Sequence, residues 1–227
     1  EGPMEELRRT VLGLEGVSAT SGTIQARGSV RVSVAEQPDG SGVVLLGLEI
    51  HPVSKDGARL AVNASAPLVD DHESAVRKAF QDLTRAVRER WELRRLSDDV
   101  VVRRLQGEVT SALLQEVADR RLRAAVPTIN QMIGDERVQD IRVLDAVGAL
   151  VAIGDPAGAP GLIAATRRKP IAFWPQILYA LAQLGGEQAE GFLFTVSRGH
   201  EDARIRDIAR QALDEVVLHP LADLGDR

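Results

Sequence analysis

The 227-residue chain has no cysteine and very few aromatic residues. Without cysteine, the sequence offers no disulfide, no thiolate nucleophile and no cysteine-ligated zinc site. Aromatic residues make up only 3% of the chain, whereas hydrophobic residues make up 44%. This composition favours closely packed helices rich in alanine, valine and leucine over a ligand pocket lined with aromatic rings.

An excess of basic charge and long apolar runs are also missing. The formal net charge of −5 argues against a nucleic-acid-binding protein, which needs a net or local basic surface to displace counterions. No apolar run approaches the ~18–20 residues of a membrane-spanning helix, so we expect no membrane span in this chain. The opening "EGPM" carries no basic and apolar signal segment. We interpret it as a trimmed start, which leaves an upstream signal peptide or lipid anchor open.

Residue patterns that would indicate catalysis are absent as well. The four histidines, His51, His72, His200 and His219, stand in unrelated contexts without metal-ligand spacing. The glycine-rich "GDPAGAPG" at 154–161 lacks the Lys-Ser/Thr of a phosphate-binding loop and follows a helical pattern, so it predicts a turn between helices. We therefore expect a protein that is not an enzyme, with no catalytic residue, metal or cofactor.

The first part of the chain alternates apolar and polar residues with a period of two. This pattern predicts strands at about 24–35, 42–51 and 58–66. The short turns between them, "QPDGSG" and "SKDG", indicate an antiparallel meander. The middle strand is apolar at nearly every residue, which is typical of a strand covered on both faces. The preceding segment, 5–19, fits a short helix or a first strand.

At Asp70 the pattern becomes helical. Apolar residues at helical spacing predict a helix at about 71–95. Acidic residues stand at its start, and helix capping and the helix dipole explain them without a bound cation. Its apolar stripe needs a surface, and the predicted sheet offers one. Its arginine-rich side is best explained as a solvated face with pairs such as Arg85–Glu89, the alternative being an anion or partner surface. We therefore assign residues 1–96 to a small α+β domain.

The second part of the chain repeats. "AVGALVAIGDPAGAPGLI" at 146–163 has a counterpart at 176–194, 31 residues further on, and both contain a helical run ending in glycine, Gly154 or Gly185. Fainter copies lie on either side of these two. Periods of ~20–50 residues built from helix pairs indicate a stacked α-solenoid. We assign residues 97–218 to this solenoid and 219–227 to a C-terminal tail.

The run "AVPTINQMIGDERVQDIRVLDAVGALVAIGDPAGAPGLI" resembles HEAT repeats of the short bacterial kind, the PBS-lyase HEAT-like repeats, and the resemblance covers about residues 108–217. The family consists mostly of scaffolds and docking surfaces, with a few enzymes that attach bilins to phycobiliproteins. The resemblance implies a protein–protein interaction scaffold or adaptor. The alternatives are a bilin-lyase-like enzyme or lyase subunit, and a nucleic-acid-binding helical-repeat protein.

The first domain is similar, much more loosely, to small α/β domains joined to such repeats in bacterial envelope proteins. From this likeness, the missing cysteine and the trimmed start, we expect a periplasmic or envelope-associated bacterial lipoprotein, with a cytoplasmic protein as the alternative. Its expected partner is another protein of unknown identity, and not nucleic acid.

One stretch of the repeat region, 165–184, is the best candidate for a partner-binding surface. Basic residues there precede an aromatic-rich helix, and exposed aromatics beside cations are typical interface anchors. Helical spacing predicts a core stripe of Ile171, Trp174, Ile177, Leu178, Leu181 and Leu184. The predicted partner-binding residues are Phe173, Gln176, Tyr179, Gln183, Arg167 and Arg168. The alternative is that this face packs against the end of the repeats or the other domain.

Overall fold

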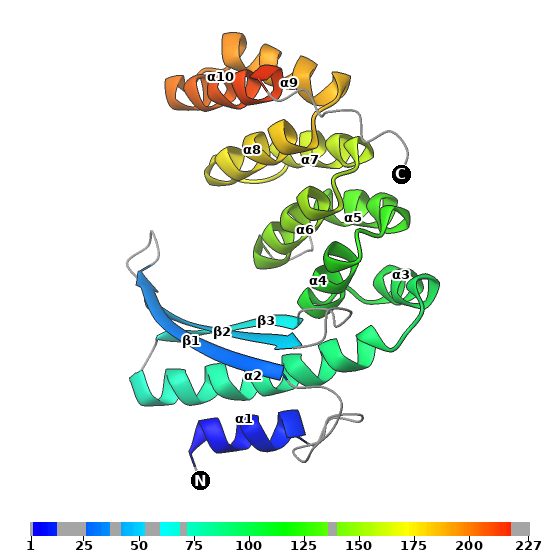
Figure 1. Ribbon diagram of the computed structural model, residues 1–227. Helices are drawn as coiled ribbons and strands as arrows, with labels where there is room; N and C mark the ends of the chain where they lie inside the picture. Colours follow the sequence, from blue (N-terminus) through cyan, green and yellow to red (C-terminus); the bar gives the residue numbers. More distant parts are fainter. Residues whose placement is uncertain are drawn as a thin grey trace. The chain divides into compact units, whose positions relative to one another are not determined.

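The computed structural model describes residues 2–12, 26–36, 42–52, 60–68, 72–135 and 140–218. The chain divides into two compact units, Glu1–Arg95 and Leu96–Arg227, one residue before the boundary expected from the sequence. Most described residues are helical, and a small antiparallel sheet lies in the first unit (Figure 1). None of the described helices is long and apolar enough to cross a membrane.

The first unit contains a helix, three strands and a long helix: α1 (Pro3–Leu12), β1 (Ala26–Glu36), β2 (Gly42–Pro52), β3 (Leu60–Leu68) and α2 (His72–Arg94). The strands pair antiparallel in the order β1-β2-β3, which confirms the predicted meander. The undecided segment ahead of them is helical as far as Leu12. Predicted residues 13–19, 24–25, 58–59, 71 and 219–227 lie outside the described part of the chain.

In this unit α2 lies between the sheet and α1 (Figure 1). Alternate residues of β2, including Leu46, pack with Phe80 and Leu83 of α2 in one buried cluster. α1 adds Leu7 to this cluster. The side chain of Leu45 points to the other face of the sheet and is 40% exposed. The expectation that β2 is covered on both faces is therefore wrong for the described residues, because α1 packs on α2.

Ion pairs follow the solvent-facing side of α2. Arg77 pairs with Glu73 at 2.8 Å, and Arg85 pairs with Asp82 at 3.3 Å. The pair Arg85–Glu89 stays a prediction. Side chains three or four residues apart are neighbours on a helix, so both spacings allow a pair. These exposed pairs are typical of a solvated helix face and contribute little to stability.

The second unit is helical throughout its described residues. Its helices are α3 (Asp98–Gly107), α4 (Ser111–Asp119), α5 (Val126–Ile133), α6 (Asp140–Ile153), α7 (Ala159–Thr166), α8 (Trp174–Leu184), α9 (Glu187–Gly199) and α10 (Ala203–Leu218). Short 3-10 turns precede three of them: η1 (Arg123–Ala125), η2 (Pro156–Gly158) and η3 (Ile171–Phe173).

Contacts between these helices follow a regular pattern. Each of the pairs α3–α4, α5–α6, α7–α8 and α9–α10 packs together (Figure 1). Helices also pack on the second helix along the chain, so that α4, α6, α8 and α10 form one row and α5, α7 and α9 another. Each helix therefore buries its apolar stripe against both its pair partner and its row neighbours.

Turn chemistry explains where the helices begin and end. Gly154 follows α6 with φ of 69°, a conformation that disfavours any residue with a β-carbon. The side chain of Asp155 then accepts a hydrogen bond from the Ala157 N–H at 3.0 Å, capping η2. Pro160 occupies the first turn of α7, where no N–H is needed, and Pro127 does the same in α5, 33 residues earlier.

Candidate functional site

The predicted partner-binding residues of the sequence lie along α8 and the two turns before it. Gln176 and Gln183 are exposed, and Phe173 and Tyr179 are half-buried. Gln176, Tyr179 and Gln183 share one side of α8, because side chains three, four or seven residues apart fall on the same face of a helix. The structure thus brings these three together on one surface.

The predicted core stripe of this helix needs one correction. Ile177, Leu178, Leu181 and Leu184 are buried, but Ile171 is 51% exposed. The error arises because α8 begins only at Trp174, and residues 171–173 form the 3-10 turn η3 instead. The α-helical spacing that was used to place Ile171 in the core therefore does not reach that residue.

Trp174 is half-buried and packs within an aromatic cluster. Its ring centroid lies 6.4 Å from that of Phe192 and 4.5 Å from that of His200, the latter in an edge-to-face arrangement. His200 in turn accepts a hydrogen bond at Nδ1 from the Asp202 N–H at 3.1 Å. Trp174 and His200 therefore join the turn before α10 to the start of α8, a packing role for both.

Several of the predicted residues are already tied to neighbouring backbone or side chains. Arg168, which follows α7, donates a hydrogen bond to the carbonyl of Gly134 at the end of α5. The Tyr179 hydroxyl donates to Oε1 of Gln211 on α10 at 3.4 Å. With its amide oriented to donate, Gln176 reaches the carbonyls of its own preceding turn at 3.1 and 3.2 Å. Arg167 is exposed.

Neighbouring helix α6 extends the surface of α8. The buried residues of α6 at 146, 147, 149, 150 and 153 match those of α8 at 177, 178, 180, 181 and 184, each 31 residues later. Exposed residues of the two helices therefore lie on the same side of the row. On that side lie six residues without charge, which we call the uncharged stripe: Leu144, Gly148, Ala152, Gln176, Tyr179 and Gln183. Asp145, 31 residues before Gln176, lies on the same side, half-buried and bonded to Ser111.

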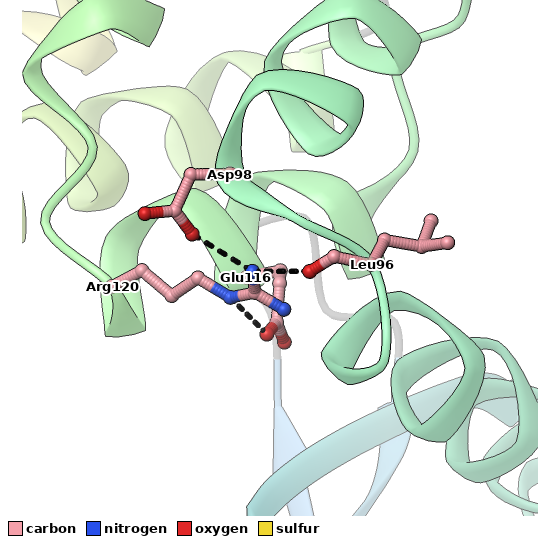
Figure 2. A network of polar contacts seen from close by, with 4 residues as sticks. All are labelled: Leu96, Asp98, Glu116 and Arg120. Carbon is pink, nitrogen blue, oxygen red and sulfur yellow. Dashed lines mark hydrogen bonds and ion pairs between the residues drawn. The ribbon is translucent and has the colours of Figure 1, made fainter.

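A buried polar network near the start of this unit was not found from the sequence. Arg120 donates from Nε to Glu116 at 2.7 Å, and from Nη1 to Asp98 at 2.9 Å and to the carbonyl of Leu96 at 2.8 Å (Figure 2). Glu116 is only 1% exposed. The network joins the start of α3 to the end of α4. The spacing of four between Glu116 and Arg120 was the only signal for it in the sequence.

Two pKa values are shifted, one in this network and one beside it. Burial alone lowers the pKa of Arg120, but its hydrogen bonds to Asp98 and Glu116 outweigh burial and raise the pKa above the usual value. Nearby, a hydrogen bond from the Ser97 side chain is the main cause of a lowered pKa at Asp99, and Arg103 adds to the effect. Arg120 thus stays charged at any physiological pH.

Metal ligands do not gather in the part of the chain that the structure describes: no three His, Asp or Glu side chains there could hold an ion together. His72 is exposed on α2, and the side chains of His51 and His219 lie outside the described residues.

Comparison with known proteins finds no relative of this chain. Neither a protein-family model, nor a curated protein, nor a solved structure matches the chain.

Proposed function

We propose that residues 97–218 form a short α-solenoid of HEAT-like helix pairs, and that the protein is a non-enzymatic scaffold or adaptor that binds another protein. The two-row contact pattern of α4 to α10 supports the first part, since stacked repeats contact mainly their neighbours. The uncharged stripe is the observation that supports binding to another protein.

Polar contacts between successive helix pairs also support a stack of repeats. Arg142 donates to the carbonyl of Val109, 33 residues earlier, and Arg168 donates to that of Gly134, 34 residues earlier. Ser111 donates to Asp145 across 34 residues. These separations are close to the repeat spacings of 31 and 33 residues, as expected when nearby positions of adjacent layers face each other.

The uncharged stripe is unusual for a solvent-facing helix surface in this protein. Charged residues make up 27% of the chain, whereas the exposed residues of the stripe carry no charge and the neighbouring Asp145 is bonded to Ser111. Interface cores are depleted of charged residues and enriched in tyrosine, whereas solvated helix faces are normally polar and charged. The half-buried Tyr179 at its centre fits the role of an anchor residue. A protein partner with an uncharged contact surface is therefore the best fit.

Site-specific photo-crosslinking in cells of the source organism tests this function. A photo-reactive residue at Gln183 is expected to give a discrete cross-linked band with one partner protein. The matched control places the same residue at Arg204, which is exposed on α10 and outside the stripe. The partner is then identified and its binding measured with purified proteins, where Ala152→Glu should abolish it without unfolding the chain.

Two outcomes would contradict the proposal. Equal cross-linking from Gln183 and Arg204 would show that the stripe is not a specific surface. Unchanged binding by a folded Ala152→Glu variant would show that α6 is not part of the interface.

We also propose that the protein belongs to the bacterial cell envelope, on the basis of the loose likeness of its first domain. Fractionation of source cells that express the tagged full-length gene product tests this location. Recovery in the cytosolic fraction alone would contradict it.

A further inference from the structure

A hollow of about 680 Å³ lies beside the Arg120 network, between the first turns of α3 and the end of α4 with η1. Its charged lining consists of Asp98, Asp99, Arg103, Arg120, Arg121 and Arg123. The rest of the lining is apolar and includes Val102 and Leu122. The hollow is therefore a partly apolar site with an unusual density of guanidinium groups.

Two of the four arginines are neutralised by carboxylates. Arg103 pairs with Asp99 at 2.9 Å. Arg120 pairs with Asp98 at 2.9 Å and with the buried Glu116 at 2.7 Å. These pairs involve Asp98, Asp99 and Glu116 and fix their positions on α3 and α4.

Arg121 and Arg123 have no such partner. Both are exposed, and neither forms a side-chain hydrogen bond or ion pair with any residue that the structure describes. The lining holds four arginines and two aspartates, and Arg121 and Arg123 are the two arginines outside these ion pairs, in a chain whose net charge is −5. Locally, then, the hollow attracts an anion although the whole protein is acidic.

The backbone at Arg121 adopts a left-handed conformation. Its φ is 52°, and it is the only described residue other than glycine with a positive φ. Hydrogen bonds from Arg121 N to Ala118 O at 3.0 Å and from Leu122 N to Val117 O at 2.9 Å form a Schellman motif. Glycine is normally preferred at this position, and Gly154 and Gly185 occupy the ends of α6 and α8.

An arginine at this position costs folding stability that a glycine would not. Such a cost is typical of positions where a side chain serves a function. The Arg121 side chain forms no hydrogen bond or ion pair with a described residue that would offset this cost.

We propose that this hollow binds a carboxylate group carried on an apolar body, with Arg121 and Arg123 pairing with the carboxylate and Val102 and Leu122 contacting the apolar part. Arginine matches a carboxylate with two parallel hydrogen bonds. The two guanidinium groups of Arg121 and Arg123 suit the two oxygens of one carboxylate, and Asp98 and Asp99 repel a phosphate dianion more strongly than a monoanion. The site is separate from the uncharged stripe and does not depend on the function proposed for it.

Binding is tested by calorimetric titration of the full-length protein with four probes. An N-acetylated tripeptide that ends in leucine with a free carboxylate is the peptide probe, and its C-terminal amide is the uncharged control. Octanoate represents a free small-molecule carboxylate, and inorganic phosphate represents the competing anion. We expect at least one of the two carboxylates to bind, with the amide at least about tenfold weaker, as expected for the loss of a charge-assisted hydrogen bond.

Preference between the two carboxylates identifies the source of the ligand. Tighter binding of the tripeptide indicates a peptide C-terminus, and tighter binding of octanoate indicates a fatty-acid-like molecule. Absence of binding by both, equal binding of the amide, or tighter binding of phosphate would each overturn the proposal.

Variants of Arg121 and Arg123 distinguish an effect on ligand binding from an effect on folding stability. Arg123→Gln should weaken carboxylate binding about tenfold or more at an unchanged Tm. Arg121→Gly should weaken binding similarly, yet raise Tm by about 2–5 °C because it removes the unfavourable backbone conformation. The control Arg204→Gln, on α10, should change neither quantity. Wild-type binding by folded Arg121→Gly and Arg123→Gln proteins would overturn the proposal.

Discussion

Asn130 on α5 lies directly against Gly161 on α7. An ideal Cβ at Gly161 would be 2.7 Å from the Asn130 Cα, and the Asn130 amide donates to the carbonyl of Ala157 at 2.8 Å. A contact of that length with backbone cannot be relieved by rotating a side chain. The two helices of this row therefore approach as closely as they do because residue 161 has no side chain.

Gly161→Ala should accordingly destabilise the second unit. We expect a loss of about 1–3 kcal/mol in the free energy of unfolding, typical of forcing an extra methyl into a packed contact. Gly148→Ala is the matched control, because nothing lies within 4 Å of its ideal Cβ. In mid-helix that change should be neutral or stabilise by up to ~1 kcal/mol. Urea denaturation of both variants measures the difference, and similar values would contradict the close approach.

Removal of Arg120 should cost much more than an exposed ion pair. Arg120→Met leaves the carboxylate of Glu116 buried at 1% exposure without its 2.7 Å partner. Breaking a buried pair in this way costs about 3–5 kcal/mol. The double variant Arg120→Met with Glu116→Leu should recover part of that loss, since no buried charge remains. A double variant no more stable than Arg120→Met alone would show that packing, not charge, explains the effect.

Local turn chemistry made much of the fold predictable from the sequence. The strands alternate because one face packs on α2, and glycine, aspartate and proline at 154–156 set the turn between α6 and α7. The helix α2 and the three strands lie within two residues of their predicted ends. Such features depend on neighbours in the chain, which a single sequence displays directly.

Contacts between distant residues explain what the sequence did not reveal. Asp98 and Arg120 are 22 residues apart and meet only because α3 and α4 pack together. Ile171 was placed in the core by a helical period that the 3-10 turn η3 interrupts. Arg121 stands where a helix end favours glycine, so no pattern of turn residues indicated its conformation.

Acid should remove a small contribution that Asp99 makes to stability. Its pKa is lowered in the folded protein by the Ser97 hydrogen bond and by Arg103, so the contribution is present above the unfolded pKa of about 3.9. As pH falls through the lower folded pKa, that contribution is lost. Ser97→Ala should therefore be less stable than wild type at pH 7, with the difference narrowing towards pH 3. Urea denaturation at both pH values measures this, and a pH-independent difference would assign the effect of Ser97 to something other than Asp99.

Tyr179→Phe distinguishes a contact with a partner from a contact within the chain. The hydroxyl it removes makes a 3.4 Å hydrogen bond to the exposed Gln211, which is long for a bond between hydroxyl and carbonyl oxygens. Its loss should change the free energy of unfolding by less than about 0.5 kcal/mol. If the uncharged stripe binds the proposed partner, however, the same variant should reduce cross-linking from Gln183, because a tyrosine hydroxyl at an interface usually bonds across it. Undiminished cross-linking would show that only the ring of Tyr179, and not its hydroxyl, contributes to partner binding. A large loss of stability would instead show that the Tyr179–Gln211 hydrogen bond links α8 to α10 in the folded protein.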